Sequence, residues 1–130
     1  MTKVLFVCVE NAGRSQMAEA FGRAYGLQAI SAGTVPAEKV NPIVVQVMQE
    51  RGISLTGKPK MLTDQMIRES DLVVTMGCSV QEVCPTPIVE QMEKKLLNWH
   101  IEDPKGKPIE EVRQIAKQIE NKTVELLKSN

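Results

Sequence analysis

The chain has 130 residues, of which 42% are hydrophobic and 25% are charged, and sixteen basic side chains balance sixteen acidic ones. This length suits one hydrophobic core rather than two, so we expect residues 1–130 to form a single domain. The neutral charge and the scarcity of aromatic residues offer no surface for nucleic acid, and no apolar run approaches the roughly 20 residues that cross a bilayer. We therefore expect a cytoplasmic monomer whose partner is a small molecule or another protein.

The first half of the chain alternates apolar runs with helical patterns. The continuous apolar run Val4–Val7 predicts a strand buried on both faces. Helical spacing follows from Ser15, a natural residue for a helix N-terminus, to about Tyr25, and the next predicted strand is Leu27–Ser31. Asn41-Pro42 opens a further helix that Gly52 ends.

The second half continues the alternation. The predicted elements are a helix over Thr63–Glu69, a strand over Asp71–Met76, a short helix over Ser79–Val83, a strand over Leu96–Trp99 and a long amphipathic helix over Ile109–Leu127. Strands alternating with helices indicate an α/β fold with a doubly wound, parallel, four-stranded sheet flanked by helices, a flavodoxin-like three-layer sandwich.

All three cysteines, Cys8, Cys78 and Cys84, are expected beyond the carboxyl ends of predicted strands. In open parallel sheets, ligand sites form beyond the carboxyl ends of the strands. In a reducing cytoplasm such cysteines are free thiols, metal ligands or redox catalysts rather than a structural framework.

The segment between the first strand and the first helix has the spacing of an oxyanion-binding loop. Five residues separate Cys8 from Arg14, and their backbone N–H groups can surround a tetrahedral oxyanion at the helix N-terminus. Arg14 can add a bidentate fork, and the same positive field favours the reactive thiolate of Cys8, to which Ser15 could form a hydrogen bond. The alternative, that Cys8 merely ends a buried strand, is disfavoured by its place between an apolar strand and a helix. The predicted loop comprises Cys8, Val9, Glu10, Asn11, Ala12, Gly13, Arg14 and Ser15.

These residues resemble the opening of a known family. The matching segments are Val4-Leu5-Phe6-Val7-Cys8, Asn11, Arg14-Ser15, Met17-Ala18-Glu19, Ser31-Ala32-Gly33, Asn41-Pro42, Ser70 to Thr75 and Asp103-Pro104. Together they resemble the low-molecular-weight protein tyrosine phosphatases and the arsenate reductases built on the same fold. The resemblance implies that fold over nearly the whole chain, with Cys8 as the nucleophile.

Asp103-Pro104 is similar to the general-acid loop of this family, although an Asp-Pro dipeptide alone is common in turns. The resemblance implies that Asp103 protonates the leaving group. In the tyrosine phosphatases a tyrosine usually follows this dipeptide, whereas Lys105-Gly106 follows it here. That difference, with Trp99 shortly before, resembles the arsenate reductases.

Cys78 and Cys84 distinguish the two activities, because a phosphatase needs one thiol and arsenate reduction moves two electrons. The resemblance to thioredoxin-coupled arsenate reductases implies that Cys78 attacks the Cys8 sulfur and that Cys84 moves the disulfide to a site that a dithiol reductant reaches. Two core cysteines, or half of a zinc site, are the alternatives; the chain has a single histidine. The spacing from Cys78 to Cys84 is one residue shorter than in the best-known reductases, so the donor stays open between thioredoxin and a similar dithiol.

In some family members Asn, Glu, Ser and Asp hold a potassium ion beside the loop. Asn11, Glu19 and Ser31 match this set, but Lys60 stands where the Asp is expected. We expect the Lys60 ammonium to replace the cation, so that the protein needs neither a metal nor a tightly bound cofactor.

The sequence therefore predicts an arsenate reductase with Cys8, Arg14, Cys78, Cys84 and Asp103 as its catalytic residues. Its expected partners are arsenate or a phosphate-like oxyanion and a thioredoxin-like reductant. A phosphomonoesterase of the same fold is the alternative enzyme, and a module that binds an oxyanion without turnover is the alternative without catalysis.

Overall fold

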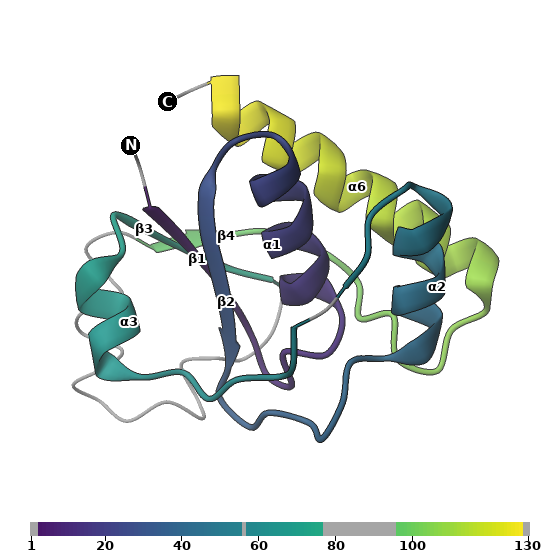
Figure 1. The fold of residues 1–130 in the computed structure, drawn as a ribbon, viewed down its shortest axis with the longest axis horizontal. Helices are drawn as coiled ribbons and strands as arrows, with labels where there is room; N and C mark the ends of the chain where they lie inside the picture. Colours follow the sequence, from purple (N-terminus) through teal and green to yellow (C-terminus); the bar gives the residue numbers. More distant parts are fainter. Residues whose placement is uncertain (1–2, 56, 77–95, 129–130) are drawn as a thin grey trace.

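The computed structural model describes residues 3–55, 57–76 and 96–128. Its four parallel strands are ordered β2-β1-β3-β4 (Figure 1), with β1 spanning Lys3–Cys8, β2 Gln28–Gly33, β3 Leu72–Thr75 and β4 Leu96–Asn98. The helices are α1 (Arg14–Ala24), α2 (Pro42–Glu50), α3 (Asp64–Glu69) and α6 (Ile109–Lys128). The predicted doubly wound parallel sheet is confirmed.

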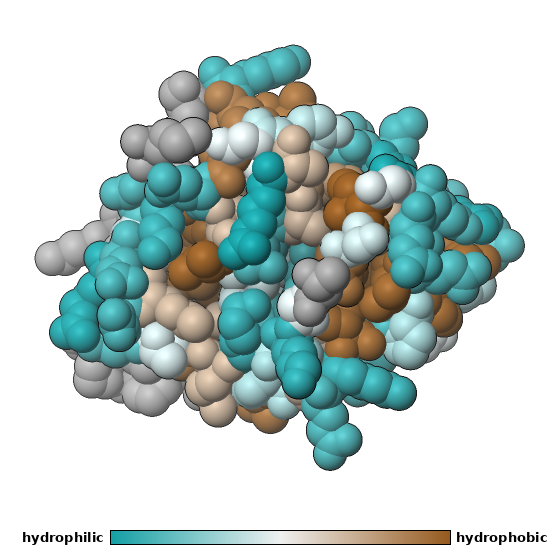
Figure 2. Space-filling model, viewed as in Figure 1, coloured by the Kyte–Doolittle hydropathy of each residue, from teal (hydrophilic) through white to brown (hydrophobic). Residues whose placement is uncertain are grey.

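Strand β1 is buried on both faces because its residues alternate between two hydrophobic clusters. Val4 and Phe6 face the larger cluster, which α1, α2 and α6 cover, whereas Leu5 and Val7 face a smaller one closed by Ile67 of α3. Figure 1 shows α3 on the opposite side of the sheet from the other helices. On the face drawn in Figure 2, hydrophobic side chains are visible as separate patches among hydrophilic ones.

The neighbours of β1 determine where a site can form. β2 and β3 lie on its two sides, so the chain reverses its winding direction at β1. In doubly wound sheets this reversal opens a crevice at the carboxyl ends of the central strands. Cys8, the last residue of β1, lies at this end.

Two helices begin within one residue of their predicted starts. Asn41 caps α2, with its Oδ1 accepting a hydrogen bond from the Ile43 N–H at 3.0 Å, and Pro42 occupies the first turn. Thr63 caps α3 and accepts from the Met66 N–H at 3.2 Å, so the helix itself starts one residue later than predicted.

The expectation that Ser15 starts α1 is corrected by one residue. The helix begins at Arg14, Gly13 occupies the cap position, and no side chain of the described residues caps the helix. The Ser15 hydroxyl lies against Cys8 instead. The first N–H groups of α1 therefore lack a side-chain cap, as an anion-binding helix terminus requires.

The other predicted elements agree to within a few residues, and the short helix predicted over Ser79–Val83 lies outside the described residues. Within the described part of the chain, no helix combines the length and apolarity needed to span a bilayer.

Candidate oxyanion site

The loop after β1 is oriented by hydrogen bonds to its carbonyl groups. The carbonyls of Cys8, Val9, Glu10 and Ala12 accept from the N–H groups of Thr34, Val35, Ala37 and Asn41 at 2.8–3.3 Å. The carbonyl of one residue and the N–H of the next point in opposite directions across a planar peptide. The segment 34–41 therefore turns the loop N–H groups away from itself, toward the side on which Cys8 and the start of α1 lie.

Gly33, the last residue of β2, allows this close approach. A Cβ atom at this position would lie 2.5 Å from the Val9 carbonyl oxygen and 2.9 Å from the Asn11 nitrogen. Both of these are backbone atoms and cannot move aside without displacing the loop. Glycine at position 33 is therefore required by the path of the oxyanion loop.

The Cys8 thiol is buried among groups that can stabilise a thiolate. Its Sγ lies 2.9 Å from Ser15 Oγ and accepts a hydrogen bond from the Asn11 N–H at 3.2 Å. The side chain is 3% exposed, and Cys8 is a free cysteine. The predicted contact between Ser15 and Cys8 is confirmed.

Asn11 gives the loop its turn. Its φ of 52° lies in the left-handed region, which asparagine tolerates better than most residues. Its side chain is fully buried and donates to Ser15 Oγ at 2.7 Å, while its Oδ1 accepts from the Lys60 N–H at 2.8 Å and from Gln16 Nε2 at 3.1 Å. These three hydrogen bonds offset the cost of the left-handed backbone.

Arg14 is held by backbone carbonyls from two other segments. Its Nη1 donates to the Met76 carbonyl, just after β3, and to the Ile101 carbonyl at 2.9 Å. Its Nη2 lies 3.7 Å from Asp103 Oδ2. Since Nη1 is engaged, the Nε and Nη2 edge is the part of the guanidinium that can form a fork with an oxyanion.

The Asp103 loop is seated directly on the oxyanion loop. A Cβ atom at Gly13 would lie 2.8 Å from Pro104 Cγ, so the two loops touch at a residue without a side chain. Asp103 Oδ1 accepts from the Lys105 N–H at 3.0 Å, a local turn that orients its carboxylate. Asp103 is exposed, and it lines the same cavity as Cys8.

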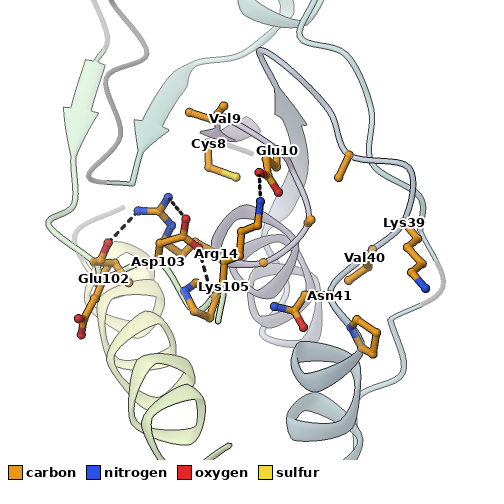
Figure 3. A pocket seen from close by; sticks show the side chains of 16 residues that line it. Cys8, Val9, Glu10, Arg14, Lys39, Val40, Asn41, Glu102, Asp103 and Lys105 are labelled. Atoms are coloured by element: carbon orange, nitrogen blue, oxygen red, sulfur yellow. Dashed lines mark hydrogen bonds and ion pairs between the residues drawn. The ribbon is translucent and has the colours of Figure 1, made fainter. Parts of the chain in front are cut away.

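The cavity has a volume of about 670 Å³ and opens between the oxyanion loop, the segment 37–42 and the Asp103 loop (Figure 3). No aromatic side chain is among the described residues that line it. At its mouth Lys105 Nζ lies 2.9 Å from Glu10 Oε1, and this hydrogen bond raises the pKa of Lys105 above its ordinary value of 10.5. Glu10 is thus paired with a cation rather than left unopposed beside the anion site.

Residues of the expected cation site lie close together. Lys60 Nζ is 3.8 Å from Glu19 Oε1, and Arg23 Nη2 approaches the same oxygen at 3.7 Å. Ser31 Oγ is buried and has no hydrogen-bond partner among the described residues. Within the described ranges, no group of three or more His, Cys, Asp or Glu side chains is arranged to hold a metal ion. That Lys60 replaces potassium stays a prediction.

The structure brings Cys8, Arg14 and Asp103 to one cavity, whereas Cys78 and Cys84 lie outside the described residues. Sequence reasoning missed the segment 34–41 and Gln16. The segment contributes backbone N–H groups, which leave no residue signature. Gln16 has no signature either, because its role depends on contact with residues 58–60, which are distant in the sequence.

Cys8, Arg14 and the loop between them, at the end of β1, form a candidate cysteine-based oxyanion site. Residues 3–129 match the family of low molecular weight phosphotyrosine protein phosphatases, and the chain belongs to that family.

Within the family the chain is similar to both reductases and phosphatases. It is 41% identical to the thioredoxin-dependent arsenate reductase of Corynebacterium glutamicum, with a TM-score of 0.77 over 99% of this chain and 61% of that one. It is 34% identical over 119 residues to arsenate reductase 2 of Staphylococcus epidermidis, covering 89% of this chain and 88% of that protein. The arginine phosphatase of Geobacillus stearothermophilus is 25% identical, with a TM-score of 0.88 over 99% of this chain and 92% of that one. Sequence identity is thus higher to the reductases, while the fold itself is common to both activities.

Proposed function

We propose that this chain is an arsenate reductase, in which Cys8 attacks arsenate and a thiol–disulfide relay returns the enzyme to its starting state. The observation that supports it most strongly is an oxyanion loop centred on a buried thiol, in a chain with 34–41% identity to arsenate reductases. The product would be arsenite, and the biological role would be resistance to arsenic.

In the first step the loop N–H groups and the Nε and Nη2 edge of Arg14 bind the arsenate oxygens. The Cys8 thiolate attacks arsenic and forms a sulfur–arsenic bond. One oxygen leaves as water, with Asp103 supplying a proton. The support for Asp103 in this role is that it lines the same cavity as Cys8.

In the second step Cys78 attacks the Cys8 sulfur. The sulfur–arsenic bond breaks, its electron pair stays on arsenic, and arsenite departs as a Cys8–Cys78 disulfide forms. Cys84 then attacks Cys78, which releases Cys8 as a thiol and leaves a Cys78–Cys84 disulfide. A dithiol reductant supplies the two electrons that reopen it. The support for the relay is in the sequence, where Cys78 follows the end of β3 at Thr75 by three residues and Cys84 follows Cys78 by six.

A phosphatase of the same fold is the alternative. The family and the Cys8, Arg14 and Asp103 arrangement are compatible with it. Against an aryl phosphate as the main substrate stands the cavity, whose described lining residues include no aromatic side chain that could stack on the substrate ring. A small inorganic oxyanion needs no such surface.

We further infer that thioredoxin or a similar dithiol protein is the electron donor, because the similar Corynebacterium glutamicum enzyme is named as thioredoxin-dependent. A catalytic cycle that starts from three free thiols requires a reducing compartment, which favours the cytoplasm. We also propose that residues 1–130 form one catalytic domain. It acts as a monomer and uses no tightly bound cofactor.

The test is arsenate-dependent oxidation of NADPH by the purified protein in the presence of thioredoxin and thioredoxin reductase, with arsenite measured directly. Turnover that requires arsenate and disappears in Cys8→Ser and Cys78→Ser would support the proposal. Turnover that persists in Cys78→Ser would contradict the relay. Absence of arsenite together with hydrolysis of phosphate esters, undiminished by Cys84→Ser, would favour the phosphatase.

A further inference from the structure

Gln16 is a buried polar residue close to Cys8. It has no role in the reaction steps proposed above. It is the third residue of α1 and is 1% exposed. A buried side-chain amide must find hydrogen-bond partners to offset its desolvation. Its Nε2 donates to Asn11 Oδ1 at 3.1 Å and to the Lys58 carbonyl at 3.3 Å.

These partners determine the orientation of two amides. A backbone carbonyl can only accept, so the NH₂ end of Gln16 must face Lys58. The Lys60 N–H can only donate, so the group of Asn11 that it meets at 2.8 Å must be the oxygen. The Gln16 amide nitrogen also donates to this atom, so it too requires that the atom is Asn11 Oδ1 and not Nδ2. Two independent donors therefore hold Asn11 with its carbonyl toward the segment 58–60.

The orientation of Asn11 determines the direction of the remaining hydrogen bonds. Its NH₂ group is left facing Ser15 Oγ at 2.7 Å, so Asn11 donates and Ser15 accepts. Ser15 has one proton, which remains available for Cys8 Sγ at 2.9 Å. A thiolate can only accept hydrogen bonds. The chain in which Asn11 donates to Ser15 and Ser15 donates to Cys8 therefore stabilises the thiolate, which is the reactive form of Cys8.

We propose that Gln16 is a positioning residue that fixes the direction of this hydrogen-bond chain and so favours the Cys8 thiolate. It acts through Asn11 and Ser15, and it ties the nucleophile to the backbone of residues 58–60. This inference rests on the proposed function only in taking Cys8 as the nucleophile. Its test reads the state of Cys8 directly, so it can fail or succeed whether or not arsenate is reduced.

The experiment is the pH dependence of Cys8 alkylation by iodoacetamide in the fully reduced protein, resolved by mass spectrometry of the Cys8 peptide. In Gln16→Met, which keeps the size of the side chain but has no N–H donor, half-maximal alkylation should move to higher pH by about half a unit. The rate at pH values below the midpoint should then fall about threefold, and the rate at alkaline pH should be unchanged. Gln49→Met, the same change on an exposed part of α2, should leave the profile in place.

A double substitution separates positioning from a general loss of packing. Ser15→Ala should shift the profile at least as far as Gln16→Met, and adding Gln16→Met to Ser15→Ala should shift it no further, because the chain acts through Ser15. If Gln16→Met does not fold, as judged by circular dichroism, Gln16→Leu takes its place. Its side chain has no donor for either partner, so the same direction of shift is expected. A folded variant with the profile of the parent protein, or shifts that add in the double variant, would overturn the inference.

Discussion

At the scale of single residues, the charge at the mouth of the cavity depends on Glu10 and Lys105. Their side chains meet at 2.9 Å across the entrance, so Lys105 neutralises a carboxylate that would otherwise repel a doubly charged oxyanion. The raised pKa of Lys105 means that the ammonium is present at neutral pH, and the pair is lost only as the pH rises through that raised value, above about 10.5.

Lys105→Met should therefore raise the KM for arsenate about two- to fivefold, with a smaller effect on kcat, because an exposed pair has a modest energy. Glu10→Gln should lower KM, and the double variant should return near the parent value. Steady-state kinetics at low and high salt measures this, and the differences should shrink at high salt. Lys117→Met, which removes the same charge from an exposed position on α6, is the control. Equal effects of the two lysine substitutions would contradict local neutralisation.

The Lys60 ammonium, 3.8 Å from Glu19, predicts indifference to potassium. Activity and thermal melting of the parent protein should be the same in sodium chloride and potassium chloride at equal ionic strength. Replacing sodium by potassium tests this directly, and a several-fold rise in activity would show that a cation binds despite Lys60.

Residue identities were predictable where chemistry requires a particular side chain at a particular spacing. Cys8, Arg14 and Ser15 follow from the length of an oxyanion loop between a strand and a helix. Gln16 was not predictable as a site residue, because its role depends on the path of residues 58–60, which are distant in the sequence.

At the scale of elements, the site is formed where two loops touch at Gly13. Gly13→Ala would place a Cβ atom 2.8 Å from Pro104 Cγ and push the Asp103 loop outward. Because a small misplacement of a proton donor is costly, we expect a loss of about 10- to 100-fold in the rate of arsenite formation. The measurement is single-turnover kinetics. Gly57→Ala, where a Cβ atom meets only an ordinary contact, is the matched control and should keep the parent rate.

A hydrogen bond links the C-terminal end of α1 to α6. Tyr25, the residue that follows α1, donates its hydroxyl to Glu120 Oε2 of α6 at 2.6 Å. That hydrogen bond raises the pKa of Tyr25 above its ordinary value of 10.0. A raised folded-state pKa means that the contribution to stability is present below pH 10 and is lost as the pH rises through the raised value.

Tyr25→Phe should consequently lower the free energy of unfolding by about 0.5 kcal/mol near neutral pH, a small effect because the residue is half exposed. Urea unfolding at neutral and strongly alkaline pH measures it. The unfolding free energies of the parent and the variant should converge at alkaline pH. A difference that grows with pH would contradict a stabilising Tyr25–Glu120 hydrogen bond.

Elements were predicted well where apolar periodicity is strong, as in β1 and α6. The start of α1 was displaced by one residue because the Ser15 side chain contacts Cys8 and does not cap the helix. The backbone hydrogen bonds from residues 34–41 to the oxyanion loop had no counterpart in the sequence pattern, since peptide N–H groups are common to nearly all residues.

At the scale of the whole molecule, the parallel strand order places Asp103 on the same crevice as Cys8 and Arg14, although Asp103 is far from both in the sequence. The fold class followed from alternation of strands and helices. The fold cannot distinguish a reductase from a phosphatase, because a phosphatase and this chain share it at a TM-score of 0.88. The distinction between the two activities depends on whether Cys78 and Cys84 are oxidised to a disulfide during the reaction.

The most direct test of arsenate reduction through these thiols is a single-turnover experiment. The fully reduced protein is mixed with equimolar arsenate and no reductant is present. We predict one arsenite per chain, loss of two of the three thiols, and a Cys78–Cys84 disulfide in the peptide map. Cys84→Ser should also produce one arsenite, with the oxidation trapped as a Cys8–Cys78 disulfide. Three thiols retained and no arsenite formed would contradict arsenate reduction by this chain.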